Sequence, residues 1–209
     1  FHIERAVNGS LTRFMNDPDA TDIMLLDVDQ GWEPQDFVRI LMHDEEVVAG
    51  TYRQKNKWHE YNGVLMLKDG RPCGKYLPDG TALLQAERVP GGFLKIRKTA
   101  LQRFHDAYPE LRAKEYGEVT LFFERIKECD PDNTVPTMFS QDMAFSWRWR
   151  KLGMPLWIDP FLKIRHGGYT EYPGDLDQHL RGEAKVQEAH TIIQGMAAEI
   201  AQRATGSQV

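Results

Sequence analysis

The stretch Ile23-Met24-Leu25-Leu26-Asp27-Val28-Asp29 decides the fold class that the sequence predicts. Its first four residues form a continuous apolar run of the kind found in strands buried on both faces of a sheet. We therefore expect a central β-strand that ends directly in two acidic residues. In open α/β sheets ligands bind beyond the carboxyl ends of the strands, so this position favours a functional site.

The segments on either side of this stretch alternate between two patterns. Apolar residues at helical spacing predict helices, and short apolar runs predict strands. Between residues 63 and 89 short apolar stretches alternate with turn signals, which indicates hairpins. Helices are expected at 3–16, from Pro34 to Leu41, at 99–105, 141–152 and 186–201, and strands at 23–26, 47–49, 93–96 and 156–158.

Length and composition restrict the class of protein. A chain of 209 residues with a formal net charge of −5 is long enough for one α/β domain and has no basic run that could follow a nucleic acid. Cys73 and Cys129 form neither a CxxC pair nor a disulfide framework, which predicts reduced thiols. No run approaches the roughly 18 apolar residues of a membrane span. We expect a soluble cytoplasmic protein with no nucleic-acid partner and no transmembrane segment.

The two acidic residues carry the first chemical hypothesis. Because Asp27 and Asp29 are one residue apart at a strand end, their carboxylates point to the same side of the sheet. Such a pair suits a hard divalent cation or a pair of donor hydroxyls. A DxD pattern on its own is common, and a solvated strand end is the alternative interpretation.

Longer blocks of sequence resemble GT-A glycosyltransferases of the family-2-like, DxD-containing type. In that family an apolar strand, a DxD, a helix begun by proline and a strand ending near Gly-x-Tyr-x-x-Lys follow one another, as they do here between Ile23 and Lys55. Three further blocks match in the same order. They are Pro90-Gly91-Gly92-Phe93-Leu94-Lys95-Ile96-Arg97, Ser140-Gln141-Asp142-Met143-Ala144-Phe145, and Gly153 to Pro160 leading to His166-Gly167-Gly168. The resemblance covers roughly residues 5–168.

The resemblance implies a fold and a domain organisation. The expected fold is α/β of the GT-A (Rossmann-like) type, a three-layer sandwich with a central mixed sheet and a β-hairpin-rich middle, over residues 1–175. Residues 176–209 would form a C-terminal helical extension, and its helix is a candidate for self-association. Family members begin with a strand–helix–strand unit that holds the nucleotide base, and we expect this chain to start after that unit.

The resemblance also implies an activity and its metal site. A sugar would pass from a nucleotide-sugar donor, with a UDP-sugar as one candidate, to an acceptor hydroxyl with the help of Mn²⁺ or Mg²⁺. Asp29 is expected as a direct metal ligand, and Asp27 would orient the ribose or a metal-bound water. His166 would complete the metal site and would favour Mn²⁺. Asp142 is the expected catalytic base, which predicts inversion at the anomeric carbon.

The remaining expected contacts divide between donor and acceptor. Lys55, Gly91 and Gly92 are placed on the donor side, and Trp32, Gln141 and Trp147 on the acceptor side. Several of these residues have plainer interpretations: Asp142 as a helix-capping acid, Trp32 as a packing residue, and either Trp147 or Trp149 as core. Lys55 and Arg97 are candidates for phosphate contacts, with solvated surface charge as the alternative. The other histidines are expected at the surface: His2, His43, His59, His105, His179 and His190.

Two rival functions remain open at this point. A nucleotidyltransferase shares a Rossmann-like sheet with acidic metal ligands, but it normally opens with a glycine-rich, basic loop that this sequence lacks. A sugar-nucleotide-binding module without catalysis is favoured by Gln141, which replaces the glutamate usual in the family. The acids Asp27, Asp29 and Asp142, together with His166, argue against the inactive module because a degenerate site is expected to lose at least one of them.

Overall fold

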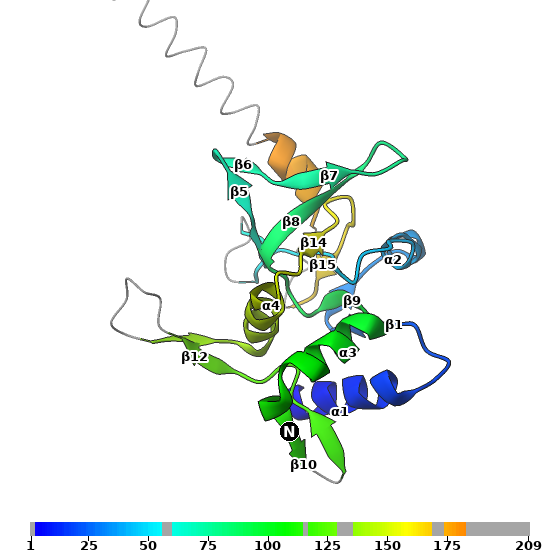
Figure 1. Ribbon diagram of the computed structural model, residues 1–209. Helices are drawn as coiled ribbons and strands as arrows, with labels where there is room; N and C mark the ends of the chain where they lie inside the picture. The colour runs from blue at the N-terminus through cyan, green and yellow to red at the C-terminus, as the bar shows by residue number, and fades with distance from the viewer. Residues whose placement is uncertain (1–2, 56–59, 115–116, 129–135, 169–173, 183–209) are drawn as a thin grey trace, which may run out of the picture.

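The computed structural model describes residues 3–55, 60–114, 117–128, 136–168 and 174–182, and within them the chain builds one large mixed sheet (Figure 1). The order of its strands is β1 (Asp22–Leu26), β9 (Phe93–Arg97), β3 (Val47–Ala49), β14 (Leu156–Ile158), β8 (Ala82–Arg88) and β4 (Val64–Leu65), and β7 (Gly74–Tyr76) also pairs with β8. The β3–β14 pair is parallel and the other pairs are antiparallel. The predicted α/β class and mixed sheet are confirmed.

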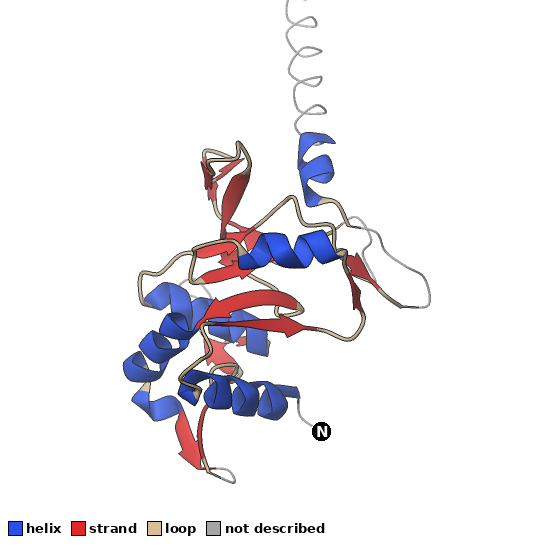
Figure 2. Cartoon of the chain, turned by 90° about the vertical axis from the view of Figure 1, so that its right-hand side faces the viewer, coloured by secondary structure: helices blue, strands red, loops and turns tan. Residues whose placement is uncertain are grey.

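Helices cover both faces of this sheet, which makes a three-layer arrangement (Figure 2). Side chains alternate between the faces along β3. Val47 and Ala49 pack in the cluster that contains residues of α1 (Ile3–Asn16), α3 (Lys98–Ala107) and α4 (Gln141–Lys151). Val48 packs on the opposite side with Ile40 of α2 (Pro34–Leu41). Each of these helices lies where its apolar spacing predicted one.

A row of aromatic rings anchors α4 beneath the sheet. The ring of Phe145 stacks on Phe123 with a centroid separation of 4.8 Å and on Phe104 at 5.6 Å. Trp149 continues the row at 6.5 Å from Phe145, is fully buried, and donates its indole N–H to the Pro155 carbonyl at 3.0 Å. Because these large rings are removed from water, they fix the position of the helix that carries Asp142.

The strand β1 does not have the central place that its apolar run predicted. Among the described residues it pairs with β9 alone and lies at one end of the strand order, so the expectation of a central strand is wrong. Ile23 and Leu25 pack on one core cluster and Met24 on the other. Apolar cover on both faces therefore explains the run, which carries no information about the neighbours of the strand along the sheet.

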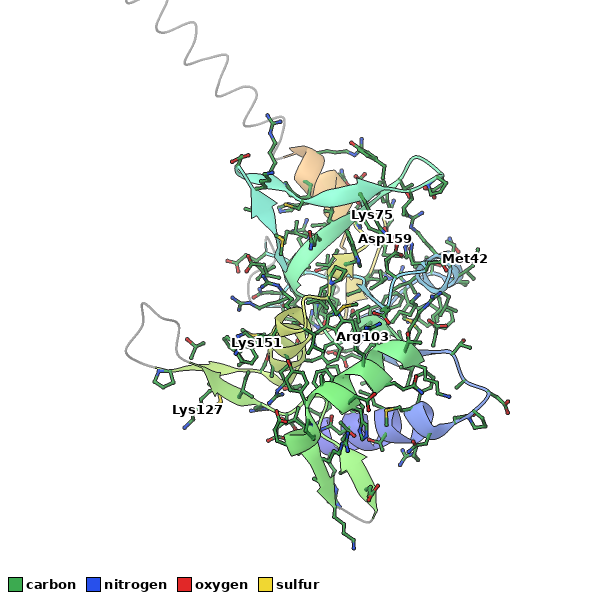
Figure 3. All side chains as sticks on the ribbon, viewed as in Figure 1. Met42, Lys75, Arg103, Lys127, Lys151 and Asp159 are labelled. Atoms are coloured by element: carbon green, nitrogen blue, oxygen red, sulfur yellow. The ribbon has the colours of Figure 1, made fainter. Side chains whose placement is uncertain are left out.

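Hairpins fill the middle of the chain, as the turn signals predicted. The strands β5 (Leu67–Lys68) and β6 (Arg71–Pro72) are joined through Asp69 and Gly70, both with positive φ, and β7 turns into β8 near Gly80. After α3 and the short 3₁₀ helix η1 (Pro109–Leu111) come two further hairpins. They are β10 (Arg112–Lys114) with β11 (Glu118–Thr120), and β12 (Ile126–Glu128) with β13 (Thr137–Phe139). The second hairpin projects from the body and carries Lys127 (Figures 1 and 3).

The last strands lead back to the start of the chain. The strand β15 (Arg165–His166) pairs with β2 (Gln30–Gly31), and helical backbone follows at 176–182. The helix predicted at 186–201, and with it most of the C-terminal extension, lies outside the described residues. Among the residues that are described, no helix has both the length and the apolar character needed to cross a membrane.

A buried charge network ties α2 to the end of β14. Asp159 is fully buried (Figure 3), and its Oδ2 lies 2.6 Å from Arg39 Nε and 2.7 Å from His43 Nε2. Its Oδ1 accepts the backbone N–H of Phe161 at 2.9 Å. His43 is only 7% exposed, so the expectation that it lies at the surface is wrong. Its partner is distant in sequence, which is why the histidine alone gave no sign of burial.

This network leads to a prediction about stability. We expect Asp159→Asn to lower the free energy of unfolding by about 2–4 kcal/mol, because Arg39 and His43 would lose a buried anionic partner. Urea unfolding of the variant would measure the loss. Asp44→Asn is the matched control, since Asp44 forms an ion pair with Arg97 but is 96% exposed, and it should unfold like the parent protein. Equal effects of the two substitutions would contradict a structural role for the buried network.

Candidate functional site

The loop after β1 is fixed in place by main-chain hydrogen bonds. The N–H of Asp27 donates to the carbonyl of Gly92 at 2.9 Å, and the N–H of Gln30 donates to the carbonyl of Asp27 at 3.1 Å. The second bond closes a turn, so the two acidic side chains stand at the end of the strand. Val28 between them is fully exposed at the apex of the turn.

The other side of this loop is held by the segment around His166. The N–H of Gly167 donates to the carbonyl of Asp29 at 2.7 Å, directly beyond the point where β15 pairs with β2. A Cβ at Gly167 would lie 3.1 Å from the Asp29 carbonyl oxygen, so a glycine lets the two segments approach closely. Residues far apart in sequence are thereby brought next to each other.

The carboxylate of Asp29 lies between a lysine and a histidine. Its Oδ2 accepts a hydrogen bond from Lys55 Nζ at 2.6 Å and lies 3.6 Å from His166 Nε2. The hydrogen bond from Lys55 is the main cause that lowers the pKa of Asp29, and the charge of Lys55 acts in the same direction. Asp29 is 41% exposed, so this pair stands at the surface of the site.

The imidazole of His166 is oriented by the backbone. Its Nδ1 lies 2.7 Å from the carbonyl oxygen of Arg53, and the ring of Tyr52 meets it edge-on at a centroid separation of 4.8 Å. A carbonyl oxygen only accepts, so Nδ1 must carry the proton of that hydrogen bond. In the neutral ring Nε2 then has a free lone pair, and this nitrogen lies 3.6 Å from Asp29 Oδ2.

Asp27 and Tyr52 converge on Gly92. A Cβ at Gly92 would lie 2.6 Å from the Tyr52 hydroxyl and 2.7 Å from Asp27 Oδ2, so this position has no room for a side chain. Partial burial, and then the charges of Asp29 and Asp142, raise the pKa of Asp27. Burial, and then the charge of Asp27, raise the pKa of Tyr52. Burial and neighbouring carboxylates therefore both disfavour the charged forms of Asp27 and Tyr52.

Asp142 faces the same site from the first turn of α4. Its Oδ1 accepts the N–H of Met143 at 2.9 Å and the hydroxyl proton of Ser140. Its Cβ lies 3.6 Å from the position of a Cβ on Gly91, and its charge raises the pKa of both Asp27 and Tyr52. The structure thus brings the three predicted acids and His166 to one place.

The donor atoms of Asp29 and His166 are separated by a distance that a single divalent cation could bridge. Two ligands that each lie roughly 2.0–2.2 Å from one ion stand about 3.0–3.6 Å apart, and the observed separation of 3.6 Å is within that range. In the described part of the chain no three His, Cys, Asp or Glu side chains are grouped closely enough to hold an ion. Asp27 therefore stands beside a two-residue pair and does not complete a three-residue cage.

The aromatic residues expected on the acceptor side have different surroundings. Trp32 is half-buried and packs on Phe37 at a centroid separation of 5.2 Å and on Phe93 at 6.1 Å, which matches its plainer interpretation as a packing residue. Trp147 is half-buried, and Lys151 Nζ lies 3.5 Å from the centre of its ring. Trp149 is the core residue of the pair.

Two other predicted residues are placed by their elements. Gln141 is the first residue of α4, next to Asp142. Arg97 is the last residue of β9, whereas Phe93 is the first. At that end of the strand Arg97 contacts Asp22 and Asp44. It is therefore at the wrong end of the strand pair for a phosphate bound beside Asp27.

Sequence reasoning did not single out Tyr52 as a site residue. It belongs to the stretch Gly50-Thr51-Tyr52, which carried part of the resemblance, so the signal was present. The carbonyl of Arg53 was also missed. A main-chain group leaves no trace in the residue types, and only the folded loop reveals it.

Comparisons with known proteins do not establish a family. No family model matches the chain, and no curated protein matches it. The solved crystal structure of A197 from STIV is similar at a TM-score of 0.48 and 15% sequence identity. The match covers 84% of this chain and 73% of that chain. A likeness of this degree carries no argument about function.

The close approach at Gly92 yields a second prediction. We expect Gly92→Ala to lower the free energy of unfolding by about 1–3 kcal/mol, because the new methyl group would push apart Tyr52 and Asp27. Gly91→Ala is the matched control, since its Cβ would find its nearest neighbour at 3.6 Å, an ordinary contact. Thermal unfolding of both variants would measure the difference, and equal melting temperatures would show that the site can absorb a side chain at Gly92.

Proposed function

We propose that this chain is a metal-dependent glycosyltransferase of the GT-A type, which moves a sugar from a nucleotide-sugar donor to an acceptor hydroxyl. One observation carries the proposal: residues from separate motif blocks, Asp27, Asp29, Gly92, Asp142 and His166, meet at a single site. If the DxD occurred by chance, residues from the other motif blocks would not be expected to lie beside it. The mixed three-layer α/β fold supports the same proposal.

On the donor side Asp29 and His166 would hold the cation. A bound Mn²⁺ or Mg²⁺ neutralises the charge that grows on a departing diphosphate. The Nε2 lone pair of His166 favours Mn²⁺, as imidazole suits transition metals. Asp27 would orient the ribose or a metal-bound water, and Gly92 would let the donor approach the main chain. Lys55, which lies 2.6 Å from Asp29, would contact a donor phosphate.

On the acceptor side Asp142 would act as the general base. Its carboxylate accepts the proton of the acceptor hydroxyl while the hydroxyl oxygen bonds to the anomeric carbon. The bond from that carbon to the diphosphate oxygen breaks, and its electron pair leaves with the diphosphate. Both hydrogen bonds that orient Asp142 go to Oδ1, so the proton is expected at Oδ2. A single attack of this kind inverts the anomeric centre.

A donor panel tests the proposal directly. The protein is incubated with Mn²⁺ and a series of nucleotide sugars, with and without hydroxyl acceptors, and the released nucleoside diphosphate is measured. Release from one donor, increased by an acceptor, is the expected result. Binding of a donor without any release would favour the inactive binding module, and release of inorganic diphosphate from a nucleoside triphosphate would favour a nucleotidyltransferase.

The role of Asp142 gives a third prediction. Asp142→Asn keeps the size and the capping ability of the side chain but removes its basicity. We expect sugar transfer to fall by about 10²-fold or more, while donor affinity and melting temperature stay nearly unchanged. Steady-state rates and donor titration would measure both quantities. Near-normal turnover would remove Asp142 from the mechanism, and a large loss of stability would favour the plain capping role.

A fourth prediction concerns Asp29. Asp29→Asn should abolish Mn²⁺-dependent donor binding, because the amide is a weaker metal ligand and the carboxylate that faces His166 is lost. The melting temperature should barely move, since the ion pair with Lys55 is exposed. Calorimetric titration of the donor with Mn²⁺ present is the measurement. Donor affinity equal to that of the parent protein would rule out Asp29 as a ligand.

A further inference from the structure

We infer that Lys55 and a divalent cation compete for one oxygen of Asp29, and that a diphosphate releases Lys55 from this oxygen, so that metal and diphosphate bind cooperatively. The competition follows from the geometry of the site. The part played by the diphosphate rests on the proposed function.

The competition is for a single atom. Lys55 Nζ lies 2.6 Å from Oδ2 of Asp29, and the same Oδ2 is the one that lies 3.6 Å from His166 Nε2. A cation bound by both residues must lie within roughly 2.0–2.6 Å of that oxygen. The ammonium group already occupies one side of the oxygen, and two positive charges this close repel each other. Binding of the cation is therefore expected to displace Lys55 from this oxygen.

Lys55 is built to move from this position. It is 41% exposed, and its partner Asp29 is equally exposed, so the ion pair has solvent around it. Exposed ion pairs of this kind contribute little net free energy. The ammonium group also stands on a flexible four-carbon stem. As a point charge it is attracted to a phosphate oxygen as well as to a carboxylate oxygen. A diphosphate bound to the cation would bring such oxyanions within reach of the same stem.

The charges of the site explain why a lysine stands there. Asp142 lies beside Gly91 and Asp27 beside Gly92, and the charges of Asp29 and Asp142 both act on Asp27. Without an ion, Lys55 offsets part of that charge from within the chain. When a cation is bound, the positive charge of Lys55 repels it. When a diphosphate is also bound, Lys55 can pair with the phosphate oxygens instead of with Asp29. Each ligand thereby removes an obstacle to the other, and such coupling is reciprocal.

The experiment measures Mn²⁺ affinity in four combinations. The parent protein and Lys55→Met are titrated at controlled free Mn²⁺, each without and with inorganic diphosphate, a probe that does not depend on the nucleotide base. For the parent protein we expect diphosphate to tighten Mn²⁺ binding by about 5- to 100-fold. Lys55→Met should bind Mn²⁺ alone about 3- to 10-fold more tightly than the parent protein, and diphosphate should tighten it much less.

A matched control separates this effect from a general change in charge. Lys163→Met also removes an exposed lysine. Lys163 Nζ lies 3.3 Å from Asp175 Oδ2 and has no part in the pair formed by Asp29. This variant should bind Mn²⁺ like the parent protein. Circular dichroism would establish that each variant is folded. Equal or weaker Mn²⁺ binding by Lys55→Met, or no Mn²⁺ binding by any of the proteins, would overturn the inference.

The outcomes also distinguish this inference from the proposed function. If Lys55→Met tightens Mn²⁺ binding but diphosphate affects neither protein, the competition at Asp29 stands and the cooperative part fails together with the proposed donor chemistry. If diphosphate tightens Mn²⁺ equally in both proteins, the donor chemistry stands and the role given to Lys55 is wrong.

Discussion

Two main-chain hydrogen bonds hold the loop between β1 and β2, and the whole site depends on them. One joins Asp27 to the carbonyl of Gly92, and the other joins Gly167 to the carbonyl of Asp29. Because both are made by backbone groups, they fix the loop whatever its side chains do. The glycine-rich turn before β9 and the segment after β15 thus meet the acidic loop from two sides. That arrangement determines where the acidic side chains and the imidazole of His166 lie.

The elements of the fold could largely be predicted because their signals are local. Apolar spacing placed α1, α2, α3 and α4, and turn residues placed the hairpins in the middle. The place of β1 at the end of the sheet could not be predicted, since it depends on which distant strands pair with it. The prediction that His43 lies at the surface was wrong for the same reason, because its partner Asp159 is 116 positions away. Local patterns predict the secondary structure of a segment but not the distant residues that it contacts.

For the site, sequence reasoning identified the acids and His166 but not the way in which they are held. The proton position on His166 is set by the carbonyl of Arg53, and the narrow space at Gly92 is set by Tyr52 and Asp27 together. Both depend on distances between atoms, which residue types do not encode. The ion pair of Lys55 with Asp29 likewise became visible only in the folded chain, where a residue expected near phosphate was found on a carboxylate.

The register of β1 against β9 has a consequence for how this sequence can change. The two strands pair without interruption from Asp22 opposite Arg97 to Leu26 opposite Phe93. Because side chains alternate between faces, a slip of one residue exchanges the two faces of a strand. Leucine, isoleucine and valine can replace one another in this strand at modest cost, whereas one residue inserted or deleted would carry Asp27 away from Gly92. We therefore expect this segment to tolerate a change of composition better than a change of length.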